Sequence, residues 1–147
     1  MKILLTGAGG QLGRSVCKRM PSEWDLIALN SSELDITSGP QVDTVFQKHK
    51  PVIVINAAAY TAVDLAQSNQ KAAKAVNVEG VAHLCKACTQ NDAFLIHIST
   101  DYVFDGQKNT PYIEKDPLNP LNIYGKTKAE GELTILKSDA RSIIIRT

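Results

Sequence analysis

The sequence predicts an α/β fold built on a Rossmann-like, doubly wound parallel sheet. Three observations predict it. Short apolar runs alternate with helix-compatible segments along all 147 residues, the first apolar run leads directly into a glycine-rich turn, and no internal repeat interrupts the alternation. A chain of this length forms about one domain with a core of its own, so we expect residues 1–147 to form one unit.

Five short apolar runs are expected to form the strands of this sheet. The third is continuously apolar, as is typical of a parallel strand that is covered on both faces. The five runs are Lys2–Thr6, Asp25–Leu29, Pro51–Asn56, Ala93–Ser99 and Ser142–Thr147.

Four segments between these runs are compatible with helices. They cover residues 14–20, 38–50, 64–91 and 124–136. Val42, Val45 and Phe46 share one face of the second segment, and the third segment contains either one long helix or two. Asn122 is expected to be the N-cap of the fourth. The stretch 100–121 contains three prolines and predicts a long irregular loop, which in a compact domain is usually functional.

Composition and charge argue against several classes of protein. The net charge is +1 with 21% charged residues, so we expect neither a nucleic acid nor a membrane surface as a partner. No apolar run is long enough to span a membrane, and we expect no secretory signal before the first strand. Three cysteines, a small and odd number, indicate a reducing compartment, so we expect a cytoplasmic protein.

Cys85 and Cys88 form a Cys-x-x-Cys pair with His83 nearby. Such a pair could be half of a zinc site or a redox pair, but the sequence holds no second ligand pair and both cysteines lie inside a helical pattern. We therefore interpret them as small apolar residues on one helix face, and we expect no metal site.

The turn after the first strand carries glycines at three-residue intervals, Gly7, Gly10 and Gly13. Gly7 allows a tight strand-to-helix turn, Gly10 lets a pyrophosphate approach the backbone, and Gly13 lets the helix pack on its strand. The N–H groups of the helix's first turn can then bind phosphates. Because Leu12 occupies the last glycine position of the G-x-G-x-x-G pattern, the alternative of a glycine-rich turn without a ligand stays open.

Tyr124 and Lys128 lie four residues apart in the last predicted helix and so share a face. A lysine ammonium within about 4–6 Å favours the phenolate, and it can lower the pKa of a tyrosine from about 10 into the range useful for carbonyl and alcohol chemistry. An ordinary helix face is the alternative, since Tyr-x-x-x-Lys also occurs by chance.

The position of this pair strengthens the chemical interpretation. The pair follows the fourth predicted strand, which ends in Ser99-Thr100-Asp101. Ligands of open parallel sheets bind at the carboxyl ends of the strands. A hydroxyl from Thr100 or Ser99 would therefore lie on the same side as the glycine turn, where it could polarise a carbonyl oxygen.

These residues together resemble the extended short-chain dehydrogenase/reductases, and three longer strings resemble the dTDP-4-dehydrorhamnose reductase family within them. The strings are Asn56–Asp64 (NAAAYTAVD), Ser99–Gly106 (STDYVFDG) and Pro120–Gly131 (PLNIYGKTKAEG). The resemblance spans essentially the whole chain. Members of the family are about twice this length, so we expect this chain to be the N-terminal part of a longer protein whose substrate lobe is absent here.

The resemblance implies roles for individual residues of this sequence. Thr100, Tyr124 and Lys128 match the catalytic trio, while Asp101 and Tyr102 would face the substrate together with Thr100. Asn77 matches a helix asparagine that braces the active-site backbone, although a solvated helix face is an equally good interpretation. The implied cofactor-binding residues are Gly7, Gly10, Gln11, Leu12, Gly13, Asn30, Asp35, Ile36, Ala57, Ala58, Ala59, Thr61, Tyr124 and Lys128.

The end of the second predicted strand bears on the choice of cofactor. Asn30 stands where an acidic residue would normally bind the ribose 2′-hydroxyl. Asparagine does not repel a 2′-phosphate, and Arg14 follows the glycines closely. We therefore expect NADPH, with NADH possible.

The resemblance implies NAD(P)H-dependent reduction of the C4 keto group of dTDP-4-dehydro-L-rhamnose, which gives dTDP-L-rhamnose for polysaccharide synthesis. The partners would be a dTDP-sugar substrate and a second copy in a homodimer. Two alternatives stay open. One is a non-catalytic NADP-binding regulatory subunit like that of methionine adenosyltransferase, and the other is a sugar-nucleotide epimerase or dehydratase. We expect this length of chain to bind dinucleotide but to catalyse poorly.

Overall fold

Five parallel strands form one sheet in the order β2-β1-β3-β4-β5 in a computed structural model of residues 1–147. The strands are β1 (Lys2–Thr6), β2 (Asp25–Leu29), β3 (Ile53–Asn56), β4 (Phe94–Ser99) and β5 (Ser142–Arg146). From β1 the chain moves to one side to form β2 and then returns to the other side to form β3. The strand order therefore reverses between β1 and β3, which is where doubly wound sheets bind ligands. The predicted fold class is confirmed.

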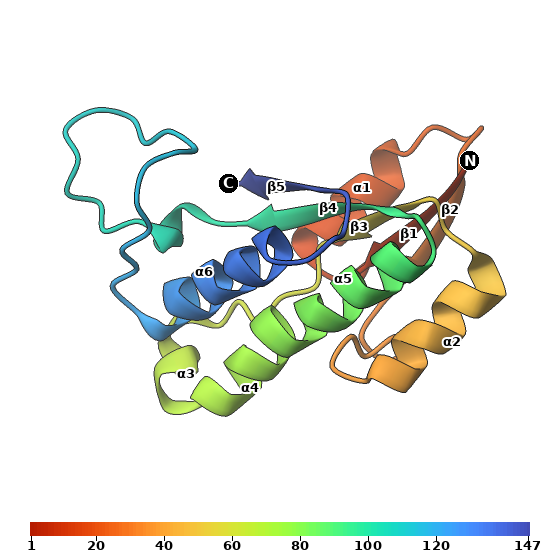
Figure 1. Ribbon diagram of the computed structural model, residues 1–147, viewed down its shortest axis with the longest axis horizontal. Coiled ribbons are helices and arrows are strands. Elements are labelled where there is room, and N and C mark those ends of the chain that lie inside the picture. The colour runs from red at the N-terminus through yellow and green to blue at the C-terminus, as the bar shows by residue number, and fades with distance from the viewer.

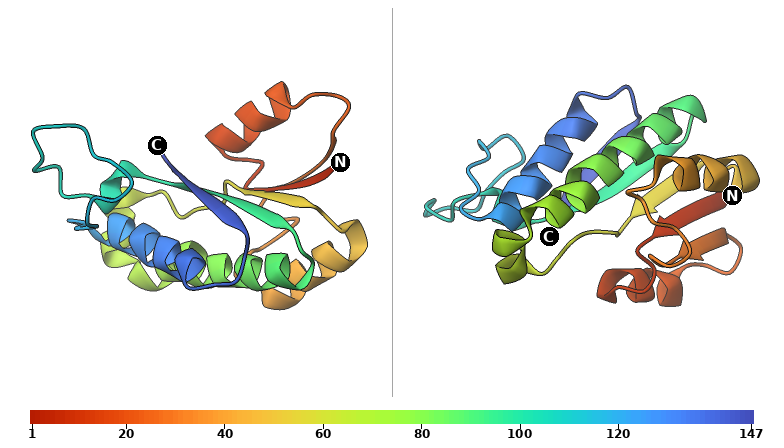
Figure 2. Two further views of the ribbon diagram at one scale, coloured as in Figure 1. Left: turned by 45° about the horizontal axis from the view of Figure 1, so that its top comes forward. Right: turned by 90° about the horizontal axis from the view of Figure 1, so that it is seen from below.

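Helices cover the two faces of the sheet unequally. One helix, α1, lies on one face, whereas α2, α5 and α6 lie together on the other (Figure 1, Figure 2). The helices are α1 (Gln11–Arg19), α2 (Gly39–His49), α3 (Val63–Ser68), α4 (Gln70–Lys74), α5 (Gly80–Gln90) and α6 (Ile123–Leu136), with a π-helical turn at Ala75–Glu79 and a 3-10 turn at Asp101–Val103. None of these helices is both long enough and apolar enough to traverse a lipid bilayer.

The core lies between the sheet and the helices of the more covered face. Leu4, Val54 and Leu95 stand in register on β1, β3 and β4, and all three are fully buried. Phe46 of α2 and Leu84 of α5 pack in the same cluster. Two residues further along the strands, the same face turns polar, with Thr6, Asn56 and His97 in register. Side chains at alternate strand positions share a face, so this polar row borders the core at the carboxyl ends of the strands.

The helix boundaries differ from the expected ones at two places. The first helix begins at Gln11 rather than Arg14, because the Gly10 N–H bonds the Gly7 carbonyl and closes the turn within four residues. The segment expected as one long helix or two has a break at Asn69, after which α4, the π-helical turn and α5 run on continuously from Gln70 to Gln90.

Four other local expectations can be compared directly. The Asn122 side chain accepts a hydrogen bond of 2.8 Å from the Gly125 N–H, so its N-cap role is confirmed. The third strand begins at Ile53 rather than Pro51, since proline has no N–H to give to a neighbouring strand. The 100–121 stretch is irregular apart from its single 3-10 turn. Cys85 and Cys88 both lie in the hydrophobic cluster, where burial raises the pKa of the Cys88 thiol to about 12.

Candidate active site

The glycine turn after β1 can be tested for its fit to a dinucleotide. Gly7 adopts φ +69°, which favours glycine, and a Cβ there would lie 2.6 Å from the Ala57 carbonyl carbon. A Cβ on Gly13 would lie 2.3 Å from the Gly7 carbonyl oxygen. No side chain caps the start of α1, so the N–H groups of its first turn are free of side-chain partners. Backbone this close to solvent at a helix N-terminus suits a pyrophosphate.

A cavity of about 420 Å³ opens beside this turn, at the point where the strand order reverses. It is bounded by the glycine turn after β1, the segments after β2 and β3, and the π-helical turn. The lining residues are Gly7, Gly9, Gly10, Asn30, Ser31, Leu34, Asp35, Ile36, Ala57, Ala58, Ala59, Tyr60 and Val76. The small side chains at 57–59 leave room for a ligand next to the backbone.

Most residues proposed for the cofactor line this cavity, and some do not. Gln11, Leu12 and Thr61 are exposed outside its lining, while Gly13 is buried in the contact between α1 and the turn. Tyr124 and Lys128 also lie outside the lining. Five lining residues were not predicted from the sequence: Gly9, Ser31, Leu34, Tyr60 and Val76. All except Val76 are adjacent in sequence to a predicted residue, and this adjacency could have indicated them.

Asn30, at the mouth of this cavity, is held in a local turn. Its side-chain oxygen accepts hydrogen bonds from the Ser32 N–H at 2.9 Å and the Ser32 hydroxyl at 2.7 Å. Arg14 donates to the Gly9 carbonyl at 2.7 Å, which holds its guanidinium near the glycine turn. The Asn30 amide group therefore has donors free, but Glu33 accepts from the Asn30 N–H at 3.0 Å, so a 2′-phosphate here would meet a carboxylate as well as the Arg14 guanidinium.

The carboxyl end of β4 brings two of the proposed catalytic residues together. Thr100 is 6% exposed, and its hydroxyl lies near enough to the Tyr124 phenol to act against the rise in the Tyr124 pKa. The same hydroxyl accepts from the Tyr102 N–H at 3.2 Å and donates to the Asp101 carboxylate at 3.2 Å. These contacts hold the Thr100 oxygen at the end of the strand, beside the first turn of α6.

Lys128 lies one turn further along α6 and is almost fully buried, at 2% exposure. Its Nζ donates to the Ile98 carbonyl at 2.7 Å and lies 3.4 Å from His97 Nε2. Burial lowers the pKa of Lys128 to about 8, against an opposing effect of the nearby Glu132 carboxylate. An amine with this pKa exchanges protons near neutral pH.

The expectation of a lowered tyrosine pKa is wrong for this structure. The pKa of Tyr124 is raised, chiefly because the phenol is partly buried, and Asp101 and Tyr102 add to the rise while the Thr100 hydrogen bond opposes it. Spacing alone placed Tyr124 and Lys128 on one face, but it could not show that the lysine turns inward to the Ile98 carbonyl.

Asp101 and Tyr102, proposed to face a substrate, are both exposed next to this site. The Tyr102 ring meets the Tyr124 ring edge-on, with centroids 5.6 Å apart. A Cβ on Gly125 would lie 2.1 Å from the Tyr102 carbonyl oxygen, so glycine is required for α6 to approach this segment so closely. Two aromatic rings and a hydroxyl thus border an open surface at the end of β4.

Asn77 connects the dinucleotide cavity to α6. It is 1% exposed in the π-helical turn, its Oδ1 accepts from the Tyr60 N–H at 2.9 Å, and its Nδ2 donates to the Tyr60 carbonyl at 3.2 Å and to the Thr127 hydroxyl at 3.0 Å. The alternative of a solvated helix face is therefore wrong. The Asn77 side chain ties a wall of the cavity to the helix that carries Tyr124 and Lys128.

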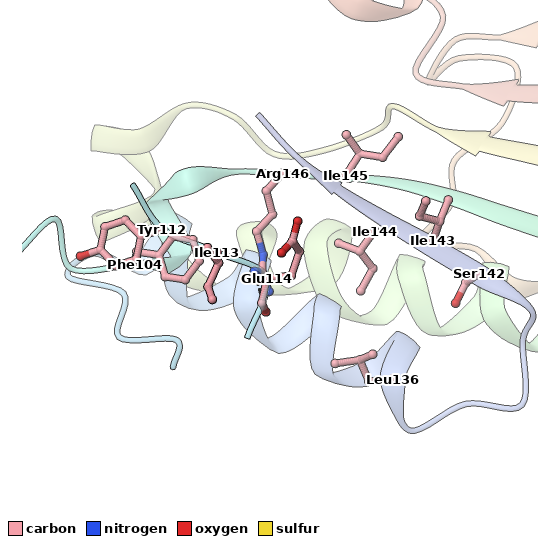
Figure 3. Close-up of a pocket in the computed structure, with 10 residues that line it drawn as sticks. All are labelled: Phe104, Tyr112, Ile113, Glu114, Leu136, Ser142, Ile143, Ile144, Ile145 and Arg146. Atoms are coloured by element: carbon pink, nitrogen blue, oxygen red, sulfur yellow. Dashed lines mark hydrogen bonds between the residues drawn. The ribbon is translucent and has the colours of Figure 1, made fainter. Parts of the chain in front are cut away.

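A larger cavity, of about 640 Å³, lies at the free edge of β5 and not at this site (Figure 3). Its lining is mainly apolar, with Glu114 and Arg146 as its charged residues. It lies away from the glycine turn and from the reversal of strand order, and it contains none of the residues proposed for chemistry. The smaller cavity and the carboxyl end of β4 are therefore the candidate site.

Comparison with known proteins shows which family the chain belongs to. The model of the RmlD substrate binding domain family matches residues 1–147. The chain belongs to this family. Among curated relatives of this RmlD family chain, the dTDP-4-dehydrorhamnose reductase of Aggregatibacter actinomycetemcomitans is 47% identical over 148 residues, which covers 99% of the chain and 50% of the relative.

Solved structures similar to this RmlD family chain share its arrangement of elements. The dTDP-4-dehydrorhamnose reductase of Clostridium acetobutylicum is 41% identical, with a TM-score of 0.95 over 99% of this chain and 52% of that one. The Bacillus anthracis enzyme of the same name, solved in complex with NADP, is 36% identical, with a TM-score of 0.96 over 99% of this chain and 52% of that one. The chain spans about half the length of these relatives.

Proposed function

We propose that this chain forms the dinucleotide-binding and proton-donating part of an NADPH-dependent dTDP-4-dehydrorhamnose reductase. The observation that carries the proposal is that Thr100, Tyr124 and Lys128 gather at the carboxyl end of β4, on the same edge of the sheet as the glycine-lined cavity at the reversal of strand order. The names of the relatives and the NADP complex of one of them support the same conclusion. NADH remains a second possible cofactor, and a dTDP-sugar is the proposed substrate.

Different residues of this chain would bind the cofactor and transfer the proton. The turn at Gly7–Gly13 would hold the pyrophosphate, and Ala57, Ala58 and Ala59 would lie along the adenosine half. Asn30 and Arg14 would meet the 2′-phosphate. When bound, NADPH would supply the hydride for the C4 carbonyl of dTDP-4-dehydro-L-rhamnose.

The proposed proton transfer uses the residues at the end of β4. Thr100 would hold the carbonyl oxygen of the sugar, and Tyr124 would donate the proton that converts the developing alkoxide to the alcohol. The raised pKa of Tyr124 keeps the phenol protonated at neutral pH, as a proton donor requires. Asp101 and Tyr102 would contact the sugar nucleotide.

Turnover of NADPH with dTDP-4-dehydro-L-rhamnose tests this proposal. Because the chain spans about half the length of its relatives, the assay is run on the chain and on a protein of their full length that carries the same residues. Tyr124→Phe should abolish most turnover while leaving NADPH affinity within about twofold, and Lys126→Met, an exposed lysine of the same helix, is the control. Unchanged turnover in Tyr124→Phe would refute the role of the phenol.

A non-catalytic dinucleotide-binding module is the second candidate. The observation in its favour is that the proposed catalytic residues lie outside the lining of the cavity, which is complete without them. NADPH binding without oxidation of the cofactor in both forms of the protein would support this candidate. An epimerase would instead interconvert sugar nucleotides with no net oxidation of cofactor.

A further inference from the structure

Three fully buried polar side chains stand side by side across β1, β3 and β4. Thr6 on β1 pairs in register with Asn56 on β3, which pairs with His97 on β4. The Thr6 hydroxyl donates to Asn56 Oδ1 at 2.7 Å, and Asn56 Nδ2 lies 3.0 Å from His97 Nδ1. The steps described above leave His97 without a role.

The Ala58 backbone fixes the orientation of the Asn56 amide. The Ala58 N–H, which can only donate, lies 3.2 Å from Asn56 Oδ1, so that atom has to be the oxygen. The NH₂ group of Asn56 therefore points at His97 Nδ1, and this nitrogen has to accept. A neutral imidazole that accepts at Nδ1 carries its proton on Nε2.

The protonated Nε2 faces the Lys128 amine. Lys128 Nζ lies 3.4 Å from His97 Nε2 and already donates to the Ile98 carbonyl at 2.7 Å. An ammonium group has donors only, so an N–H directed at it opposes its charge, whereas the lone pair of a neutral amine can accept that N–H. The polar row thus discriminates between the two protonation states of Lys128.

We propose that His97 is a positioning residue for Lys128: held by Asn56 with its proton on Nε2, it presents an N–H to Nζ and favours the neutral amine. The Ile98 carbonyl on one side and the imidazole on the other fix where this amine lies.

The charges around the pair are consistent with this arrangement. Burial first, and then the charge of Lys128, lower the pKa of His97 to about 3, so the ring stays neutral at all pH values relevant to turnover. Glu132, one turn further along α6, is the buried carboxylate that favours the ammonium. Its charge is shared with Arg146 of β5, which binds both carboxylate oxygens, and Asp101 lies exposed at the end of β4.

The consequence for turnover rests on the proposed function. After Tyr124 has given its proton to the sugar oxygen, the phenolate has to be reprotonated. A neutral Lys128 carries no charge that would favour the phenolate, so Tyr124, which is half-buried, would regain its proton from solvent. A Lys128 fixed as an ammonium would instead favour the phenolate and oppose this return of the proton.

Nitrogen-15 NMR of the labelled 147-residue chain tests the proposal without any assay of activity. The shifts of the two ring nitrogens report the tautomer, and we expect the Nε2–H form of His97 from pH 6 to 9. We expect Lys128 to titrate near pH 8, below the ordinary lysine value of 10.5. An Nδ1–H tautomer, or a charged imidazolium at pH 7, would overturn the proposal, and so would a Lys128 that titrates above pH 10.

Two variants on β1 and β3 test the source of the tautomer. Asn56→Asp replaces the donor to Nδ1 by an acceptor, so His97 should change to the Nδ1–H form and Lys128 should titrate at higher pH. The control Thr6→Val removes one donor to Asn56 but keeps the Ala58 N–H, so the tautomer should not change. A folded Asn56→Asp chain that keeps the Nε2–H tautomer would also overturn the proposal. Because these readouts are spectroscopic, a failure of the reductase proposal would leave them unaffected, and the two outcomes are distinguishable.

Discussion

Replacement of Asn77 by alanine should destabilise the fold and weaken dinucleotide binding together. The Asn77 side chain makes three hydrogen bonds from a nearly fully buried position, two of them to the backbone of Tyr60. Alanine removes all three and leaves the N–H and carbonyl of Tyr60 without these partners. Thr127 keeps its bond to the Tyr124 carbonyl at 2.9 Å, so it contributes little to the loss.

The size of the effect follows from the two Tyr60 groups. A buried polar group left without a partner costs about 1–3 kcal/mol, and because Tyr60 is only half-buried the lower part of this range applies to each group. The free energy of unfolding should therefore fall by about 2–4 kcal/mol, which corresponds to a decrease in Tm of roughly 5–15 °C. Since Tyr60 lines the dinucleotide cavity, NADPH affinity should fall as well.

Urea unfolding followed by circular dichroism measures the stability, and calorimetric titration with NADPH measures the affinity. Asn91→Ala is the matched control, because Asn91 is exposed at the end of α5 and bonds only the Ala87 carbonyl. It should lose about 1 kcal/mol or less. Equal losses in the two variants would refute the reasoning. An Asn77→Ala chain that is less stable but binds NADPH normally when folded would refute the link to the cavity alone.

Three further changes have defined outcomes. Glu132→Ala leaves Arg146 without its buried partner, so urea unfolding should show a loss of about 3 kcal/mol. Gly13→Ala places a Cβ 2.3 Å from the Gly7 carbonyl oxygen, so stability should fall by about 1–3 kcal/mol and NADPH titration should show weaker binding. The pKa of His97 is about 3 when folded and 6.5 when free, so the stability it contributes above pH 6.5 is lost as the pH falls toward 3. The difference in unfolding free energy between wild type and His97→Gln should therefore shrink by up to about 1.4 kcal/mol per pH unit across that window.

Matched controls accompany the first two of these changes. Asp92→Asn breaks an exposed ion pair with Arg141 while keeping a residue that tolerates the positive φ of 52° at this position, and it should cost less than about 0.5 kcal/mol. Gly39→Ala places a Cβ at an ordinary 3.4 Å from the His83 ring, so neither stability nor NADPH affinity should fall. A Glu132→Ala chain as stable as Asp92→Asn, or a Gly13→Ala chain that binds like Gly39→Ala, would contradict the respective argument. A constant difference between wild type and His97→Gln from pH 7 to 4 would contradict the third.

The sequence was sufficient to predict the elements whose signal is local. Apolar runs located β1 and β2 to the residue, and Asn122 was recognised as a cap because its side chain acts three residues away. The glycine spacing located the turn after β1. Each of these features depends on a few neighbouring residues, which is why the prediction did not need the tertiary fold.

Features that depend on tertiary contact could not be predicted in this way. His97 lies within an apolar run, and nothing local shows that the strand register brings it beside Asn56. The pKa of Tyr124 depends on burial and on Asp101, not on spacing from Lys128. The π-helical turn at Ala75–Glu79 has no compositional signature. From the sequence alone, Asn77 could therefore lie either on a solvated helix face or at the candidate site.

The π-helical turn at Ala75–Glu79 fixes the number of residues between α4 and α5. A π-helical turn accommodates one residue more than an α-helical one, so loss of a single residue there would rotate everything after it by about 100°. Either Asn77 would then swing away from Tyr60, or Leu84 and its neighbours would leave the core. Insertions and deletions within 70–90 should therefore be selected against, because no single-residue change in length keeps both the Asn77 contacts and the core contacts of α5.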